Sequence, residues 1–144
     1  MADSLVLDVP TIGERTFVRS RGGKNAYSRL RQQFGLEMVL IKAEDFEAGW
    51  STAPGYVAAD LSMHKLDKRF ERFEKFLAEN EVIEMANVHI TAGGRINIRD
   101  GKHRTRVLLN LGMEAIPVTM PAASVDLLER CYTDLAQAKQ VAGA

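Results

Sequence analysis

The stretch Ile96–Val118, INIRDGKHRTRVLLNLGMEAIPV, contains the pattern that decides the fold. Its first residues alternate between apolar and polar, which predicts a β-strand, and a turn at Gly101 follows at once. Residues 102–111 have the apolar spacing of a helix that ends at Gly112, and residues 115–120, AIPVTM, predict another strand. We therefore expect a strand, a tight turn, a helix and a strand in immediate succession.

The start of the expected helix concentrates positive charge, because Lys102, His103 and Arg104 follow Gly101 directly. Backbone N–H groups in a first helical turn lack partners within the helix and bind anions well. Basic side chains at the same place cost about 0.3 to 1 kcal/mol each when no anion is bound. A bound phosphate would remove that cost. A structural role fits the residues equally well, with Asp100 capping the helix, Arg104 pairing with a carboxylate and His103 packing beside the sheet.

The rest of the chain predicts a mixed α/β or α+β domain, because helical and strand patterns are interspersed. The hairpin signal is two alternating runs, which include Val88 and Ile90 and then Ile96 and Ile98, joined by Gly93-Gly94. The other expected elements are a short helix over Asn25–Phe34, a strand at Met38–Ile41, a loop over residues 47–60, an amphipathic helix around Leu66–Leu77 capped by Asp60 or Asp67, and a last helix over Ser124–Val141 capped by Ser124.

Length and composition indicate one ordinary globular domain. The chain has 144 residues, of which 46% are hydrophobic and 26% charged. No apolar run approaches the roughly 18 to 20 residues that a membrane helix needs. The opening MADSLVLDVPTIGER lacks the basic start and the apolar core of a secretion signal, and the lone Cys131 cannot form an internal disulfide. We expect a cytoplasmic protein with no membrane contact.

The overall charge does not favour nucleic acid, since 19 basic residues balance 19 acidic ones. Any anion binding must come from two local clusters, RSRGGK at Arg19–Lys24 and RDGKHRTR at Arg99–Arg106. The three histidines have no metal-ligand spacing and no Cys-x-x-Cys occurs, so we expect no transition-metal site.

The segment DGKHRTRVLLNLGMEAIPV resembles the signature segment of the ParB/sulfiredoxin superfamily. In that family a strand ends in Gly-x-His-Arg or Gly-Glu-Arg-Arg, a helix follows, and Leu-Gly, a short gap and Ile-Pro-Val lead to the next strand. MVLIKAEDF is similar to the family's early strand, and DKRFERFEKFLAENEV to the helix before its hairpin. The resemblance covers roughly Leu36–Met120, a little over half of the chain.

This resemblance implies a small mixed sheet flanked by helices, with an added C-terminal helix. The implied organisation is an N-terminal extension with a short helix over residues 1–35, a ParB/sulfiredoxin-like domain over residues 36–120, and a C-terminal helix packed on that domain over residues 121–144. It also implies a nucleotide, ATP or CTP with Mg²⁺, whose phosphates the turn would hold. The phosphate-binding candidates are Gly101, Lys102, His103, Arg104 and Thr105.

The resemblance is partial in two respects. Sulfiredoxins have their catalytic cysteine between the glycine and the histidine, where this chain has Lys102, so we do not expect a cysteine-dependent sulfiredoxin. Chromosome-partitioning ParB proteins read Gly-Glu-Arg-Arg at the turn and carry further DNA-binding and dimerisation modules. We expect a stand-alone member from a plasmid, phage or mobile element, where such proteins resemble nucleotide-hydrolysing or nuclease-like relatives.

Three functional hypotheses follow. The first is nucleotide or phosphate binding, extended to hydrolysis if Asp100 or Glu44 positions a water molecule. The second is a DNA-binding or nuclease-like protein, with Arg19, Arg21, Arg95 and Arg99 extending a basic track. The third is an interaction module that inhibits a protein partner through its last helix. A homodimer is a further expected arrangement, with no surface assigned to it. The phenylalanines at positions 70, 73 and 76 are expected in the core, with a base-stacking platform as the alternative.

Overall fold

The computed structural model describes residues 4–19, 36–61 and 67–131, and within these ranges the chain forms two small sheets and four helices. The first sheet has the strand order β1-β2-β4, with β1 antiparallel to β2 and β2 parallel to β4. Its strands are β1 (Ser4–Val9), β2 (Gly13–Val18) and β4 (Val82–Glu84).

The second sheet has the order β3-β7-β5-β6, in which β5 is parallel to β7 and the other two pairs are antiparallel. Met85 alone separates β4 from β5, so the two sheets are joined by nearly continuous chain. The strands of this sheet are β3 (Leu36–Lys42), β5 (Ala86–Ile90), β6 (Ile96–Asp100) and β7 (Ala115–Pro121).

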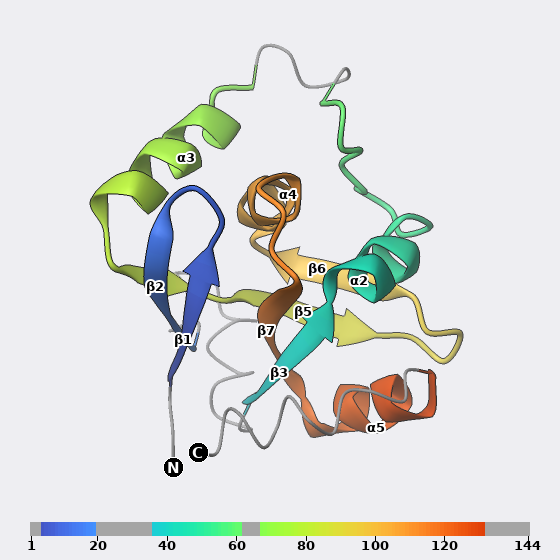
Figure 1. Ribbon diagram of the computed structural model, residues 1–144. Helices are drawn as coiled ribbons and strands as arrows, with labels where there is room; N and C mark the ends of the chain where they lie inside the picture. The colour runs from blue at the N-terminus through green and yellow to red at the C-terminus, as the bar shows by residue number, and fades with distance from the viewer. Residues whose placement is uncertain (1–3, 20–35, 62–66, 132–144) are drawn as a thin grey trace.

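Helices cover both faces of the four-stranded sheet. In Figure 1, α2 and α4 lie above this sheet and α5 lies below it, while α3 runs beside the three-stranded sheet. One continuous apolar core fills the space between these layers and includes residues from both sheets. The four helices are α2 (Ala43–Trp50), α3 (Arg69–Glu79), α4 (Lys102–Asn110) and α5 (Ala122–Cys131).

The expected α+β class with flanking helices is confirmed, as is the strand, turn, helix and strand succession. The described strands form two small mixed sheets, where one was expected. The hairpin pairs Ile90 with Ile96 and Val88 with Ile98, as the alternation predicted. Its tight turn is closed by a hydrogen bond from the Gly94 N–H to the Thr91 carbonyl. These elements depend mainly on near neighbours in the chain, which is why the pattern revealed them.

The expected loop over residues 47–60 begins too early, because α2 continues to Trp50. Phe46 and Trp50 are one helical turn apart, and both are buried with their rings 5.9 Å apart in an edge-to-face arrangement. This apolar pair stabilises the last turn of α2 against the core. Gly49, taken as a helix breaker, is buried in that turn. The irregular segment therefore begins at Ser51.

The cap expected at Ser124 is also wrong. The helix begins two residues earlier, at Ala122, and Ser124 lies inside its first turn. The Ser124 hydroxyl oxygen accepts a hydrogen bond from the backbone N–H of Ile90, at 3.1 Å. It therefore joins the end of β5 to α5, a contact over 34 positions that sequence-local capping rules do not consider.

The start of the chain forms a hairpin that the sequence pattern did not indicate. Leu5, Val9 and Phe17 from this hairpin are buried in the common core, and β2 pairs with β4. The helix expected over Asn25–Phe34 lies outside the described residues, as do residues 132–141 of the expected last helix. The helix expected around Leu66–Leu77 is confirmed from Arg69. Its N-cap position is Lys68, one residue after the expected cap Asp67, and Asp67 Oδ1 accepts the Arg69 backbone N–H at 3.0 Å.

Candidate functional site

Gly101 makes the turn between β6 and α4 in a conformation that favours glycine. Its φ of 102° and ψ of 22° lie in the left-handed region. A Cβ at this position would lie 2.7 Å from Arg104 Nη2 and 2.9 Å from the Ala86 Cβ. The Thr105 N–H and hydroxyl both donate to the Gly101 carbonyl, at 2.9 and 2.8 Å. Both Thr105 donors thus bind the same carbonyl oxygen. The Thr105 hydroxyl proton is therefore already engaged within the turn.

No side chain caps the start of α4, and its first turn contains no acidic residue. Asp100, the expected cap in the structural interpretation of this turn, instead forms an ion pair with Arg104 at 3.6 Å between Oδ2 and Nη2. Within the described part of the chain, the positive end of the helix therefore keeps N–H groups without a side-chain cap, next to basic side chains. This combination is suited to an anion.

Arg104 has buried N–H groups that lack an acceptor. Its Nε and Nη2 atoms are shielded from solvent and have no hydrogen-bond partner among the described residues. The side chain as a whole is 24% exposed, and this exposure lies on atoms other than Nε and Nη2. Buried donors of a charged group are costly to leave unpaired. Arg104 therefore has an ion-pair partner in Asp100 but keeps two donors that no hydrogen bond within the described chain uses.

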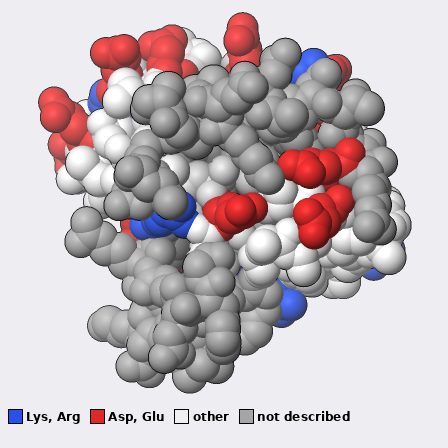
Figure 2. Space-filling model, turned by 90° about the horizontal axis from the view of Figure 1, so that it is seen from below, with Lys and Arg blue, Asp and Glu red and all other residues white. Residues whose placement is uncertain are grey.

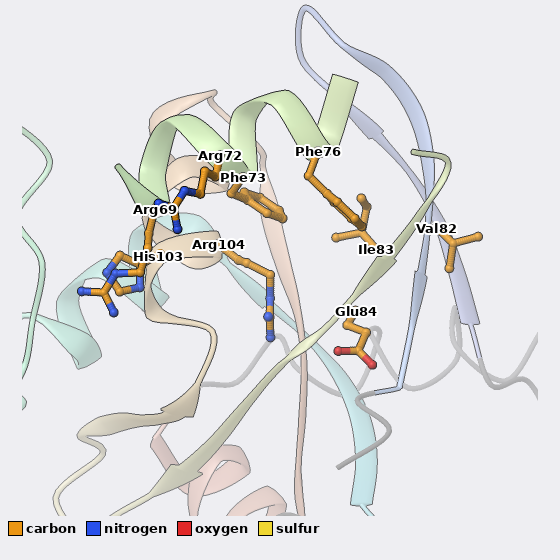
Figure 3. A pocket seen from close by; sticks show the side chains of 9 residues that line it. All are labelled: Arg69, Arg72, Phe73, Phe76, Val82, Ile83, Glu84, His103 and Arg104. Carbon is orange, nitrogen blue, oxygen red and sulfur yellow. The ribbon is translucent and has the colours of Figure 1, made fainter. Parts of the chain in front are cut away.

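Arg104 and His103 line a pocket of about 440 Å³ between α3, β4 and the start of α4. Figure 3 shows the Arg104 side chain extending from α4 toward β4, and Phe73 and Phe76 extending from α3. The Phe73 and Phe76 rings are stacked with centroids 6.3 Å apart, and Phe76 is 46% exposed. The pocket thus combines basic and aromatic side chains with one carboxylate, that of Glu84. Its lining residues are Arg69, Arg72, Phe73, Phe76, Val82, Ile83, Glu84, His103 and Arg104.

The phenylalanine stripe of α3 is divided between core and pocket. Phe70 and Phe73 are buried, as expected for core residues. Phe76 leaves almost half of its surface in contact with solvent at the pocket. One of the three residues is therefore in position to pack against a planar ligand.

His103 is held by Asp67, a residue that the sequence indicated only as a helix cap. The His103 Nε2 lies 3.1 Å from Asp67 Oδ2, and the imidazole ring lies 4.8 Å from the Phe70 ring. Burial lowers the pKa of His103, and the hydrogen bond to Asp67 offsets this only in part. Burial thus favours the neutral imidazole, and in the tautomer with its proton on Nε2 the ring donates to Asp67.

Asp67 also accepts hydrogen bonds from the side chain of Arg69, to Oδ1 at 3.0 Å and to Oδ2 at 2.9 Å. These bonds and the bond from the Arg69 N–H hold the pKa of the Asp67 carboxyl far below its usual range. Asp67 thus stays ionised and orients His103. An Asp–His pair separated by 36 positions has no short motif, so the sequence could not identify it.

Arg106 differs from the other basic residues of the turn because all three of its guanidinium nitrogens donate hydrogen bonds within the protein. It is 2% exposed, and it donates from Nη1 and Nη2 to the two carboxylate oxygens of Glu47, at 3.0 and 2.7 Å. Nη1 also donates to the Val57 carbonyl at 3.0 Å, and the Tyr56 hydroxyl donates to Glu47 at 2.6 Å. Burial by itself would raise the pKa of the Glu47 carboxyl. The hydrogen bonds from Arg106 and Tyr56 and the charge of Arg106 together outweigh burial, so this pKa lies below its usual value. Arg106 therefore joins α4 to α2 and to the segment that follows α2.

The remaining candidates are not brought to the pocket. Glu44 is exposed in the first turn of α2, and Lys102 is half-buried at the start of α4. Arg95 lines a separate, more polar pocket of about 630 Å³ beside α2, and Arg99 contacts His89 on the hairpin at 3.4 Å. Arg19 follows β2, and Arg21 lies outside the described residues.

The described surface does not form a basic track on the face seen in Figure 2. On that face, acidic side chains form several separate groups, and the visible basic side chains are few and scattered. Among residues 4–19, 36–61 and 67–131 no group of three or more His, Cys, Asp or Glu side chains is placed to hold a metal ion. In these ranges, no helix is long and apolar enough to cross a membrane.

Fold and pocket together describe an α+β protein with a basic and aromatic pocket at the start of a helix. The structure is similar to the crystal structure of the oncogenic suppression activity protein, a plasmid fertility inhibition factor, in its gold(I) cyanide derivative. The TM-score is 0.64, with 17% sequence identity over 96% of this chain and 74% of that chain. At this identity the similarity shows a shared fold. No protein-family model and no curated protein sequence matches the chain.

Proposed function

We propose that the protein binds a nucleotide in the pocket between α3, β4 and α4, with the phosphates at the start of α4. The observation that carries this proposal is Arg104, whose shielded Nε and Nη2 have no acceptor among the described residues. Phosphate oxygens are acceptors that match a guanidinium in charge and in geometry. The uncapped first turn of α4 supplies backbone N–H groups to the same ligand.

The aromatic side of the pocket supports a nucleotide over a free phosphate. Phe76 is 46% exposed, and its ring lies nearly parallel to the buried Phe73 ring, with the centroids 6.3 Å apart. A base placed against Phe76 gains stacking energy of about 1 to 3 kcal/mol, as judged from single-stranded nucleic-acid complexes. A pocket lined by both basic and aromatic side chains fits a ligand that has an anionic part and a planar part.

The proposed relation to the ParB/sulfiredoxin superfamily rests on the order of β6, the Gly101 turn, α4 and β7, with Gly-Lys-His-Arg at the turn. The structural neighbour is a plasmid protein, which agrees with a place on a plasmid or another mobile element. We extend that context to this chain as part of the proposal. Inhibition of a partner protein is the corresponding alternative role.

Hydrolysis of the bound nucleotide is a second candidate, and the Asp67–His103 pair is the observation that favours it. A neutral His103 oriented by an ionised Asp67 is suited to accept a proton from a water molecule. The water oxygen would form a bond to the terminal phosphorus while the bond from that phosphorus to the bridging oxygen breaks. In this scheme His103 takes over the role expected for Asp100 or Glu44.

The proposal is tested by thermal unfolding of the purified protein with ATP, CTP, GTP and ADP, each with and without Mg²⁺. A ligand that binds only the folded state adds about 2.7 kcal/mol at a hundredfold excess over its dissociation constant. We expect stabilisation by at least one nucleotide in the wild type and in Arg95→Met, and its loss in Arg104→Met. The absence of stabilisation by every nucleotide would contradict the proposal. DNA binding that weakens steeply with salt would then favour the nucleic-acid alternative.

A further inference from the structure

The first strand of the protein is an edge strand with an apolar sequence. Among the described residues, β1 pairs only with β2, so one of its two edges carries unpaired backbone N–H and C=O groups. Five of its residues form the run LVLDV, in which Asp8 is the single charge. Val6 at its centre is 60% exposed. Natural proteins usually protect such an edge with several charges, a bulge or a covering element.

The register shows what surrounds the exposed Val6. Val6 lies opposite Thr16, and Thr16 lies opposite Val82, so these three side chains form one row across the outer face of the sheet. Val82 at the far end of this row is 52% exposed. Leu5 and Val9 alternate with Val6 and point into the core, where both are buried. The edge therefore borders an apolar row on the outer face and the core on the inner face.

We propose that the free edge of β1 pairs with β1 of a second copy of this chain, antiparallel and centred on Val6, which gives a homodimer with one continuous six-stranded sheet. In this register Val6 faces Val6 of the second copy, Leu5 faces Leu7, and Ser4 faces Asp8. Apolar residues meet apolar residues, and a serine hydroxyl meets a carboxylate that it can donate to. The pairing satisfies the open backbone groups and extends the Val6, Thr16 and Val82 row across both copies.

Other registers are less favourable for the same strand. Two-fold pairing centred on Leu7 places Val6 opposite Asp8, and pairing centred on Asp8 places two carboxylates opposite each other. Pairing centred on Leu5 leaves fewer residues of β1 in register. All of these registers keep the outer faces of the two copies on the same side of the joined sheet. Among them, the residues of β1 favour the register centred on Val6.

Charge also favours the edge of the sheet over its outer face as the contact. Asp8 lies directly opposite Glu14 on that face, so two acidic side chains are neighbours there. Packing two outer faces together would bring these acidic pairs of both copies into contact, which is unfavourable. Pairing through the β1 edge leaves them in solvent. A second copy therefore fits beside the sheet and not on top of it.

The test is the molar mass of the full chain by analytical ultracentrifugation over a micromolar to millimolar concentration series. Because the contact is small, we expect a monomer–dimer equilibrium in this range. Val6→Lys places two like charges on the two-fold axis and should raise the dissociation constant about tenfold or more. Val82→Lys changes an exposed residue of the same row on the opposite edge strand, and it should leave the monomer–dimer equilibrium unchanged. A wild-type protein that stays monomeric throughout, or two variants with equal effects, would overturn the proposal.

Cross-linking provides a second readout that does not depend on affinity. In a Cys131→Ser background, Val6→Cys places two thiols on the axis at a cross-strand distance of about 4.5 to 5.5 Å between Cβ atoms, which is near disulfide geometry. Mild oxidation should give a covalent dimer for Val6→Cys and none for Val82→Cys, with the native fold checked by circular dichroism. Equal cross-linking of both variants would indicate random collision and would overturn the assigned register.

Discussion

Arg106 and Glu47 form a paired contact across 59 positions of the chain, with both guanidinium Nη atoms donating to the two carboxylate oxygens at 3.0 and 2.7 Å. The pair connects the helix that carries the candidate site to α2. Two positions earlier on α4, Arg104 has shielded N–H groups without an acceptor. Two arginines on one helix thus have opposite roles, one joining parts of the fold and one directed at the pocket.

Removing the carboxylate of Glu47 should destabilise the protein strongly. Glu47→Ala leaves the buried Arg106 guanidinium without its charged partner, which in fully buried pairs costs about 3 to 5 kcal/mol. Because the Glu47 side chain is 34% exposed, we expect a smaller loss of about 2 to 3 kcal/mol in the free energy of unfolding. Urea denaturation measures this value. Glu44→Ala, on the exposed side of the same helix, is the control and should change it by less than about 0.5 kcal/mol.

Arg104 and Arg106 should respond differently to substitution by methionine in the absence of ligand. Arg104→Met removes shielded donors that have no acceptor and an ion pair with Asp100 worth about 0.3 to 0.5 kcal/mol. Its free energy of unfolding should stay within about 1 kcal/mol of the wild type or rise. Arg106→Met should lower it by at least about 2 kcal/mol. A large loss of stability in Arg104→Met would mean that Arg104 serves the fold and not a ligand.

Gly101→Ala should be destabilising because of both conformation and space. An L-residue with a positive φ costs about 1 to 2 kcal/mol, and the added Cβ would press on Ala86 and Arg104. We expect a total loss of about 2 to 4 kcal/mol in chemical denaturation. Gly93→Ala is a matched control, since a Cβ there meets nothing within 4 Å and its φ is not positive. Similar losses in the two variants would show that the Gly101 turn is less constrained than its geometry indicates.

The stability of the protein should depend on pH through His103. Burial lowers the pKa of His103 in the folded state, so the unfolded chain takes up a proton first as the pH falls through about 6.5. The free energy of unfolding should therefore decrease between about pH 7.5 and 5.5, and this slope should be smaller in His103→Gln. The pKa of Asp67 is also lowered, so its carboxylate stays ionised over this range. Urea denaturation at several pH values measures both slopes, and identical slopes would show that His103 does not titrate as described.

The elements that the sequence predicted well are those defined by residues close together in the chain. The glycines at positions 93, 94, 101 and 112 marked turns, and alternating or helical apolar spacing between them defined the hairpin, α4 and β7. The N-terminal hairpin was missed because its short strands are stabilised by packing into the core and by pairing of β2 with β4, which is distant in the sequence. The role of Ser124 also depends on a distant residue, because its hydroxyl accepts the backbone N–H of Ile90.

For the candidate site, the sequence by itself determined the Gly101 turn and the basic residues that follow it, because a left-handed turn and a helix start depend on the local backbone. It could not separate the roles of those residues, since their partners are far away in the chain. Only the tertiary structure decided that Arg106 is paired with Glu47, that Asp67 orients His103, and that Arg104 faces a pocket beside Phe76. The physical reason is that burial and ion pairing depend on which elements pack together, and that packing involves residues tens of positions apart.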